Sequence, residues 1–237
     1  HRQAMASAQR LLADETLGLW RLLDPPLAAT VPAAGYIQAY PPGVRENGGQ
    51  YSHATAWAAM ALARLGDADG AWRTWTWLSP AHRAAHPVRG PVYGLEPYVM
   101  AADVYSQPPY AGRGGWSWYT GSSAGMQRAA IESIFGLEVA GDRLRLRPQL
   151  PSHWPSATLR LRRGGRRHLL TLCADWASDA IAQALAQGAL ALAEKEWLDT
   201  AEAGDRSHHL VICAARPSAA AAETEHAVHA GAPMRPA

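Results

Sequence analysis

Apolar side chains recur at helical spacing through much of the first 140 residues of this 237-residue chain. The spacing predicts an amphipathic helix over residues 3–23, ended by Pro25-Pro26 because a proline ring cannot continue a helix. A second clear pattern predicts a helix over 122–135, and a shorter candidate lies at 97–105. The first part of the chain is therefore expected to be helical, with long irregular loops between the helices.

A helix–turn–helix unit is predicted between residues 53 and 80. Residues 53–65 form the first helix, and Gly66 ends it because glycine adopts the left-handed conformation without steric cost. Asp67 or Asp69 then caps a second helix through its carboxylate, and Pro80 follows the end of that helix. Helices packed in successive pairs predict part of an α/α toroid.

Later in the chain the pattern changes to alternation of apolar and polar positions, which is typical of half-buried strands. Leucine alternates with arginine at 143–147 and at 159–162, Gly164-Gly165 is suited to a hairpin turn, and Leu170 and Leu172 continue the pattern beyond it. Residues 209–213 are predicted to form a closing strand. Residues 180–193 stay open between helix, which their alanines favour, and strand, which their context favours.

These patterns predict a mainly α chain with a β appendage, in three segments. We expect a helical domain over residues 1–140, a small antiparallel β-sandwich over 141–215, and a disordered tail over 216–237, which has no periodic apolar face. Ten tryptophans and eight tyrosines stand out in the composition. Such rings can stack on sugars, although any single tryptophan more often fills a helical core.

Charge and cysteine content exclude several classes of protein. The formal net charge of +2 argues against a nucleic-acid partner, and the arginines between 160 and 167 are expected to form a solvated strand face because no aromatic platform interleaves with them. Cys173 and Cys213 are expected to be reduced and buried, since two thiols make no disulfide scaffold. No metal site is predicted.

Two segments are too polar and too rich in glycine and aromatics to be ordinary connections. The first, residues 35–53, delivers Arg45, Glu46, Gln50 and His53 to the start of the helix that follows. Long ordered loops within compact domains are usually functional. His53 falls in the first helical turn, where free amide donors and the helix dipole favour an anion.

The second segment, residues 112–125, enters the helix predicted over 122–135. Thr120 is predicted to be its N-cap, and small residues from Gly121 onward leave the first amide groups unobstructed. The two helix starts could converge on one tetrahedral oxyanion, with Trp116, Trp118 and Tyr119 beside it as sugar platforms. The competing interpretation is that Thr120 only caps a helix and His53 only satisfies a backbone carbonyl.

The amino-acid sequence of these segments resembles that of family 94 glycoside phosphorylases, in particular the C-terminal phosphorylase module of cyclic β-1,2-glucan synthases. The likeness lies in the Gly-Val-Arg-Glu-Asn-Gly-Gly-Gln-Tyr-x-His run ending at His53, in Glu-Pro-Tyr-Val at 96–99, and in Gly-Gly-Trp-x-Trp-Tyr-Thr-Gly-Ser at 114–122. It covers residues 1 to about 172. It fits the β region less distinctly and the tail not at all.

The resemblance implies the C-terminal part of an (α/α)6 barrel followed by a small β-sandwich. It implies an inverting phosphorylase that needs no cofactor and uses inorganic phosphate as co-substrate, with an aspartic acid protonating the leaving oxygen. In the family, a histidine matching His53 and a Thr-Gly pair matching Thr120 and Gly121 hold the phosphate. Substrate contacts are expected from Arg45, Glu46, Gln50, Trp116, Trp118 and Tyr119.

The chain departs from the family in one respect. The family's catalytic acid belongs to a segment upstream of the region matched here, so we expect no general acid within this chain and no activity from the chain alone. Glu46 is expected to bind sugar hydroxyls and Asp103 to brace a loop. Arg45 could contact phosphate or sugar, and a salt bridge to a nearby carboxylate is an equal alternative.

The leading hypothesis is thus a fragment of a hexosyl-transferring phosphorylase that acts on β-glucan chain ends. The alternatives are an (α/α)6 glycoside hydrolase and a non-catalytic glycan-binding or scaffold module. Expected partners are a β-glucan oligosaccharide, phosphate and the remainder of a parent polypeptide, while an apolar half-barrel face would favour a homodimer. We expect a cytoplasmic location, in a parent protein that could associate with the inner membrane.

Overall fold

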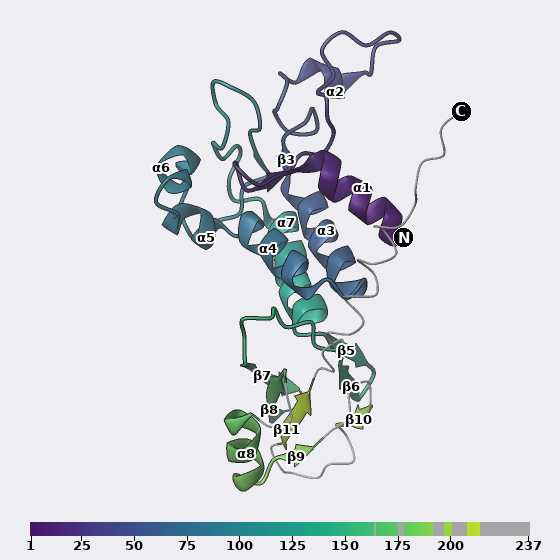
Figure 1. Cartoon of the computed structure of the whole chain (residues 1–237), viewed down its shortest axis with the longest axis vertical. Coiled ribbons are helices and arrows are strands. Elements are labelled where there is room, and N and C mark those ends of the chain that lie inside the picture. The colour runs from purple at the N-terminus through teal and green to yellow at the C-terminus, as the bar shows by residue number, and fades with distance from the viewer. Residues whose placement is uncertain (164, 175–177, 192–196, 201–207, 214–237) are drawn as a thin grey trace, which may run out of the picture.

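The structure is a computed structural model that describes residues 1–163, 165–174, 178–191, 197–200 and 208–213. A helical part precedes a β part, as predicted, and the two lie end to end (Figure 1). The helices of the first part are α1 (Arg2–Leu12), α2 (Tyr36–Ala39), α3 (Ser52–Arg64), α4 (Ala68–Leu78), α5 (Pro80–Ala85), α6 (Arg89–Tyr93), α7 (Thr120–Arg128) and the π-helix η1 (Ala129–Ile134). Within the described residues, no helix is long and apolar enough to cross a membrane.

The α3–α4 pair confirms the predicted helix–turn–helix unit. Gly66 follows the end of α3 with a φ of +84°, which an L-residue would adopt only with strain. Asp67 is the N-cap of α4, and its Oδ1 accepts a hydrogen bond of 2.8 Å from the N–H of Gly70. The turn residues thus satisfy the helix end that they create, and the two helices pack through Leu62, Ala63, Ala71 and Trp77.

The helix predicted over residues 3–23 is wrong beyond Leu12. The chain instead forms a short antiparallel pair, β1 (Ala13–Asp14) with β2 (Leu19–Trp20). Asp14 turns the chain by accepting the N–H of Leu17 at 2.9 Å, and Gly18 has a φ of +59°. Leu19, which the helical spacing assigned to the helix face, is buried from the hairpin instead, so tertiary packing overrides helical spacing there.

The helix predicted over residues 97–105 is also wrong. Residues 103–104 form β4 (Asp103–Val104), which pairs antiparallel with β3 (Gln50–Tyr51). Val99 and Ala102 are buried along with their neighbours, so the segment needs an extended backbone that can reach β3 rather than a one-sided helix face. This misassignment matters because β3–β4 is the pair that joins the two loop segments.

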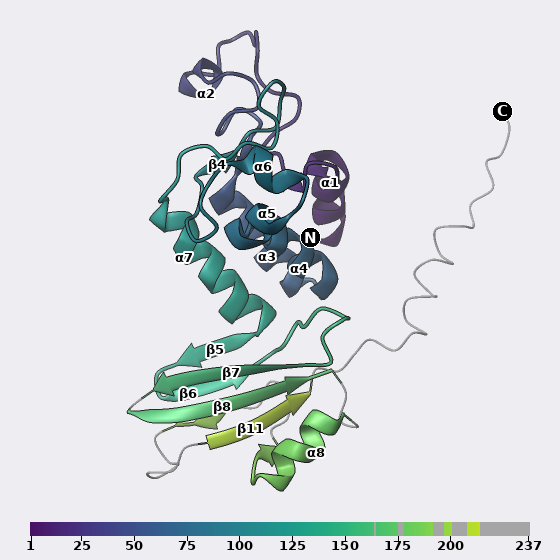
Figure 2. The same cartoon turned by 90° about the vertical axis from the view of Figure 1, so that its left-hand side faces the viewer.

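The helix predicted over residues 122–135 is confirmed as α7 followed by η1, but it begins two residues earlier. Tyr119, and not Thr120, is the N-cap, so the predicted cap is wrong, and Thr120 is the first helical residue. Trp118, with a φ of +61°, turns the chain just before the helix and sets this earlier start. Figure 2 shows α7 running from the loop-rich end of the helical part to the β part.

The β part contains two sheets on one apolar core. A three-stranded sheet has the order β10 (Leu198–Asp199), β6 (Arg143–Leu146), β5 (Leu137–Ala140), and a four-stranded sheet has the order β7 (Ser156–Arg163), β8 (Arg166–Cys173), β11 (His208–Cys213), β9 (Leu190–Ala191). The core includes Leu144 and Leu146 from the first sheet and Leu170 and Leu172 from the second. The predicted hairpin is confirmed, because Arg163 pairs with Arg166 across the turn.

Two details of the β part differ from the fully antiparallel arrangement expected. The closing strand β11 is confirmed, but it runs parallel to both β8 and β9. The open segment at 180–193 contains α8 (Asp179–Ala186), which covers the outer face of the four-stranded sheet through Ile181 and Ala184 and supplies the crossover that parallel strands need. Cys173 is buried opposite Cys213 in the pairing register. The predicted tail, 216–237, lies outside the described residues.

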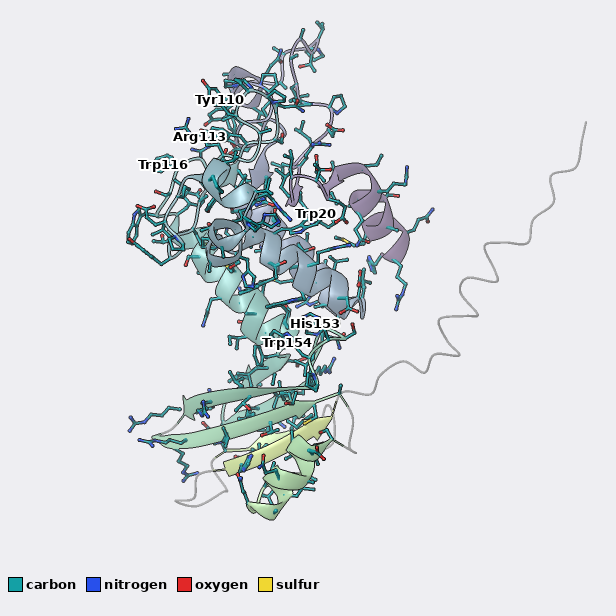
Figure 3. The ribbon with its side chains drawn as sticks, turned by 60° about the vertical axis from the view of Figure 1, so that its left-hand side comes forward. Trp20, Tyr110, Arg113, Trp116, His153 and Trp154 are labelled. Carbon is teal, nitrogen blue, oxygen red and sulfur yellow. The ribbon has the colours of Figure 1, made fainter. Side chains whose placement is uncertain are left out.

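An aromatic cluster joins the two parts. Trp72 of α4 stacks on Trp75 with ring centroids 5.1 Å apart, and it meets Trp154 at 4.6 Å. Trp154, which Figure 3 labels with His153 at the junction, also faces Phe135 at 6.4 Å. The carboxylate of Asp69 accepts the N–H of Ser152 at 2.7 Å. The start of α4 is therefore tied to the segment that leads into β7.

The cap of α4 makes a direct stability prediction. Replacing Asp67 by Ala leaves the N–H of Gly70 without its acceptor and should lower the free energy of unfolding by about 1 kcal/mol. Urea denaturation followed by circular dichroism measures the change. The control is Glu15→Ala, which removes only an exposed pair with Arg73 and should change the stability by less than about 0.5 kcal/mol.

Candidate functional site

Short strands bring the two predicted loop segments together. In the β3–β4 pair, Gln50 lies opposite Val104 and Tyr51 opposite Asp103, and Val104 forms a further bridge with Gly114. Residues 35–53 and 96–122 therefore lie side by side. Neither the spacing nor the composition of the sequence predicted this strand pairing. This arrangement sets α3 and α7 against each other with both starting at the same loop cluster.

The carboxylate of Asp103 holds this loop cluster from inside. Asp103 is buried, its Oδ2 accepts the N–H of Arg45 at 2.7 Å, and the carboxylate also accepts the N–H of Trp116. Burial raises the pKa of this carboxyl above its ordinary value, and the two N–H groups oppose that rise. The bracing role expected for Asp103 is confirmed for the loop that carries Arg45.

His53 lies against α7. It is the second residue of α3, and a Cβ placed on Gly125 would lie 3.4 Å from its Cδ2 and 3.5 Å from its Nε2. Gly121 and Gly125 are four residues apart and therefore share one face of α7. Thus the imidazole contacts the face that carries Gly121, about one helical turn from the start of the helix. A side chain longer than a methyl group at position 125 would need the space that the ring occupies.

The first turn of α7 is open. No heavy atom lies within 4 Å of the position that a Cβ on Gly121 would occupy, and Thr120 beside it is exposed. The first amide groups of an α-helix lack carbonyl partners within the helix. His53, Thr120 and Gly121 therefore belong to one region, although phosphate binding by them stays a prediction.

The guanidinium group of Arg45 lies between two aromatic rings. Its Cζ is 5.6 Å from the ring centre of Tyr40 and 5.4 Å from that of Trp116, and its Nε lies 3.7 Å from the Oε2 of Glu46. The ion-pair alternative for Arg45 is therefore observed. The backbone of Arg45 has a φ of +48°, which the hydrogen bond to Asp103 helps to hold. Ligand contacts from Arg45 and Glu46 stay predictions.

Exposed rings surround this region. Trp116 and Trp118 are each 67% exposed, and Tyr98, which the sequence analysis left out of the site, meets Trp118 edge to face at 6.4 Å. Figure 3 places Trp116 at the loop-rich end with Tyr110 and Arg113, far from the aromatic cluster at the junction. Aromatic rings in this position present apolar surface to solvent, and the apolar face of a sugar could cover it.

The structure shows contacts of Gln50 and Tyr119 that the sequence did not indicate. Gln50 is buried, and its Oε1 accepts the N–H of Trp20 at 3.1 Å, so its observed contact fixes β2, while contact with substrate stays a prediction. Tyr119 contacts Tyr51, with hydroxyl oxygens 3.3 Å apart. Tyr51 was overlooked because only the fold brings it next to Tyr119. Gly125 left a signal, since it repeats Gly121 at helical spacing.

Among the described residues, no group of three histidine, cysteine or acidic side chains is arranged to hold a metal ion. The chemistry that the arrangement offers is that of backbone amides, an imidazole, an arginine and aromatic faces. Such groups suit an oxyanion next to a neutral, hydroxyl-rich ligand.

Comparison with known proteins gives a consistent picture. The model of the "Glycosyl hydrolase 94 superfamily, catalytic domain" matches residues 1–136. Over 173 residues, 73% of the chain, the sequence is 46% identical to cyclic beta-(1,2)-glucan synthase NdvB of Rhizobium meliloti (strain 1021). It is 30% identical over 152 residues, 63% of the chain, to solabiose phosphorylase of Paenibacillus borealis. It is 28% identical over 163 residues, 65% of the chain, to N,N'-diacetylchitobiose phosphorylase of Vibrio proteolyticus.

The chain spans only a small part of these relatives. The matched region is 6% of the glucan synthase and 19% of each of the two phosphorylases. The activities in those names therefore belong to much longer proteins.

The support given by Asp103 can be tested without any ligand. Asp103→Ala removes a buried carboxylate and leaves the N–H groups of Arg45 and Trp116 without their acceptor, so the free energy of unfolding should fall by about 2–4 kcal/mol. Chemical denaturation measures this change. Asp24→Ala is the matched control, because that carboxylate only faces Arg21 at 3.8 Å near the surface, and a similar loss in both variants would contradict the role of Asp103.

Proposed function

Because the chain belongs to the glycosyl hydrolase 94 superfamily, we propose that it is the C-terminal part of an inverting glycoside phosphorylase module that acts on β-glucan chain ends. The helical residues up to Ile134 form the last part of an (α/α)6 barrel, and the β-sandwich follows it. The sandwich begins with β5 at Leu137 rather than at the predicted residue 141, because β5 pairs with β6. The names of two relatives support a phosphorylase, and that of a third supports glucan as the substrate class.

One observation carries the proposal: the imidazole of His53, at the start of α3, packs on the face of α7 that carries Gly121. Two helix starts combine their amide donors and dipoles at one place, which favours a tetrahedral anion. His53 and the Thr120–Gly121 pair bind inorganic phosphate there. The competing interpretation, in which Thr120 only caps a helix and His53 only satisfies a backbone carbonyl, does not require α3 and α7 to meet.

In the proposed reaction a phosphate oxygen attacks the anomeric carbon of the terminal glucose. The new carbon–oxygen bond forms as the β-glycosidic bond breaks, so the product is α-glucose 1-phosphate and the configuration inverts. The leaving oxygen takes a proton from a general acid. We place that acid outside this chain, because Asp103 is buried and engaged by two backbone N–H groups and Glu46 faces Arg45.

The sugar lies on the aromatic side of the phosphate. Trp116, Trp118 and Tyr119 provide ring faces, while Arg45, Glu46 and Gln50 supply polar groups around them. The remainder of the parent polypeptide completes the barrel and contributes the acid. Phosphate is already an anion at neutral pH, so the site needs no general base and no cofactor.

Two rival functions make different predictions. An (α/α)6 hydrolase would cleave glucan without phosphate, because water would be its nucleophile. A non-catalytic glycan-binding or scaffold module would bind oligosaccharide, which tryptophan fluorescence reports, with no effect of phosphate. The phosphorylase requires that cleavage depend on phosphate and release glucose 1-phosphate.

The decisive variant is His53→Ala in the full-length protein that contains this chain. Loss of the imidazole should reduce phosphorolysis of a β-1,2-glucan oligosaccharide at least 100-fold, because a charge-assisted contact to phosphate is lost in a desolvated site. Release of glucose 1-phosphate measures the rate. The control His82→Ala removes an exposed histidine of α5 and should leave the rate within about twofold. Full activity of the His53 variant would refute the phosphate role.

Gly125 offers a graded test of the same contact. Gly125→Ala places a methyl group at ordinary contact distance from His53 and should be tolerated, with a gain of about 0.5–1 kcal/mol from helix propensity. Gly125→Leu needs the space that the imidazole occupies, so it should raise the KM for phosphate by at least tenfold. An unchanged KM in the leucine variant would mean that His53 binds no phosphate.

A further inference from the structure

The two helices that meet at the site are each preceded by a tyrosine. Tyr51 is the N-cap of α3 and Tyr119 is the N-cap of α7, and neither side chain caps its own helix. Their hydroxyl oxygens lie 3.3 Å apart, although 68 residues separate them in the sequence. The side chains that introduce the two helix starts are therefore in direct contact with each other.

The backbone positions both tyrosines on the same stretch of chain. The N–H of Tyr119 donates to the carbonyl of Met100 at 3.0 Å, and that of Ser52, next to Tyr51, donates to the carbonyl of Ala102 at 2.9 Å. Residues 100–102 thus lie between the two helix starts and hold each by a single main-chain bond. The contact between the two hydroxyl groups gives a second connection between the helix starts, through the side chains rather than the backbone.

The chemistry of the pair suits a place beside an anion. Two phenols carry two hydroxyl protons, and their mutual hydrogen bond uses only one of them. The hydrogen bond to Tyr119, together with burial, raises the pKa of Tyr51 to about 12. The Tyr51 hydroxyl therefore stays protonated at neutral pH and adds no negative charge near the start of α3.

We propose that Tyr51 and Tyr119 form a clasp that fixes the separation of the first turns of α3 and α7 and thereby sets the affinity for phosphate. Their hydroxyls have a positioning role, because they act through the two helix starts rather than on the reacting atoms, and removing the hydroxyl of Tyr119 keeps the ring face proposed for the sugar. This inference rests on the proposed phosphate role of His53, Thr120 and Gly121. A ligand held from two sides loses affinity steeply when the sides shift by about 1 Å.

The test uses Tyr51→Phe, Tyr119→Phe and the double variant in the full-length protein that contains this chain. Each substitution keeps the ring and removes one hydroxyl. Each single variant should raise the KM for phosphate about tenfold, as the loss of one hydrogen bond allows, while kcat and the KM for glucan stay within about twofold. The double variant should be no worse than either single one, because all three lack the same bond.

Tyr36→Phe is the matched control, because Tyr36 is an exposed tyrosine of α2. The KM of this variant for phosphate should not change. Three results would overturn the clasp: an unchanged phosphate KM in both single variants, additive effects in the double variant, or equal rises in both KM values together with a lower melting temperature. Absence of phosphate-dependent cleavage in the unmodified protein would instead refute the proposed function itself, and the clasp with it.

Discussion

The buried carboxylate of Asp103 accepts backbone N–H groups from two loops that are far apart in the sequence, one at Arg45 and one at Trp116. Those loops carry nearly all of the polar and aromatic groups of the site. A carboxylate can accept from both loops because it offers two acceptor oxygens, whereas an amide side chain offers one. The loops in turn deliver the chain to the starts of α3 and α7. The geometry of the proposed phosphate site thus depends on a buried residue that does not line its surface.

Sequence patterns predicted the elements whose cause is local. Asp67 and Gly66 define the α3–α4 turn by their own chemistry, and the observed pairing of β7 with β8 agrees with a turn dipeptide between two alternating segments. Failures occurred where a partner distant in sequence decides. Leu19 is buried from a strand because core space is available there, and residues 103–104 are extended because β3 offers its backbone. The parallel direction of β11 likewise depends on β8 and β9, between which it inserts.

The residues of the candidate site also separate into those with a local sequence signal and those that depend on a distant partner. His53 and Thr120 could be singled out from the sequence, because each is placed at a predicted helix start and helix starts attract anions for a local reason. Their meeting was one of two interpretations that the sequence left open, because it depends on the packing of α3 on α7 and on the space that Gly125 leaves for a ring. The pairing of Tyr51 with Tyr119 is further from prediction, because neither residue has a neighbour in the sequence that indicates a partner.

The aromatic junction has a consequence for where the molecule can be divided. The family match ends at residue 136, yet Phe135 packs on Trp154, and Trp154 covers Trp72 of α4. A polypeptide trimmed at that boundary would leave a row of large rings facing water, and its α7 would lose the platform on which it ends. The evolutionary module and the cooperative folding unit therefore have different borders, and expression designs for this region need to extend through the sheets.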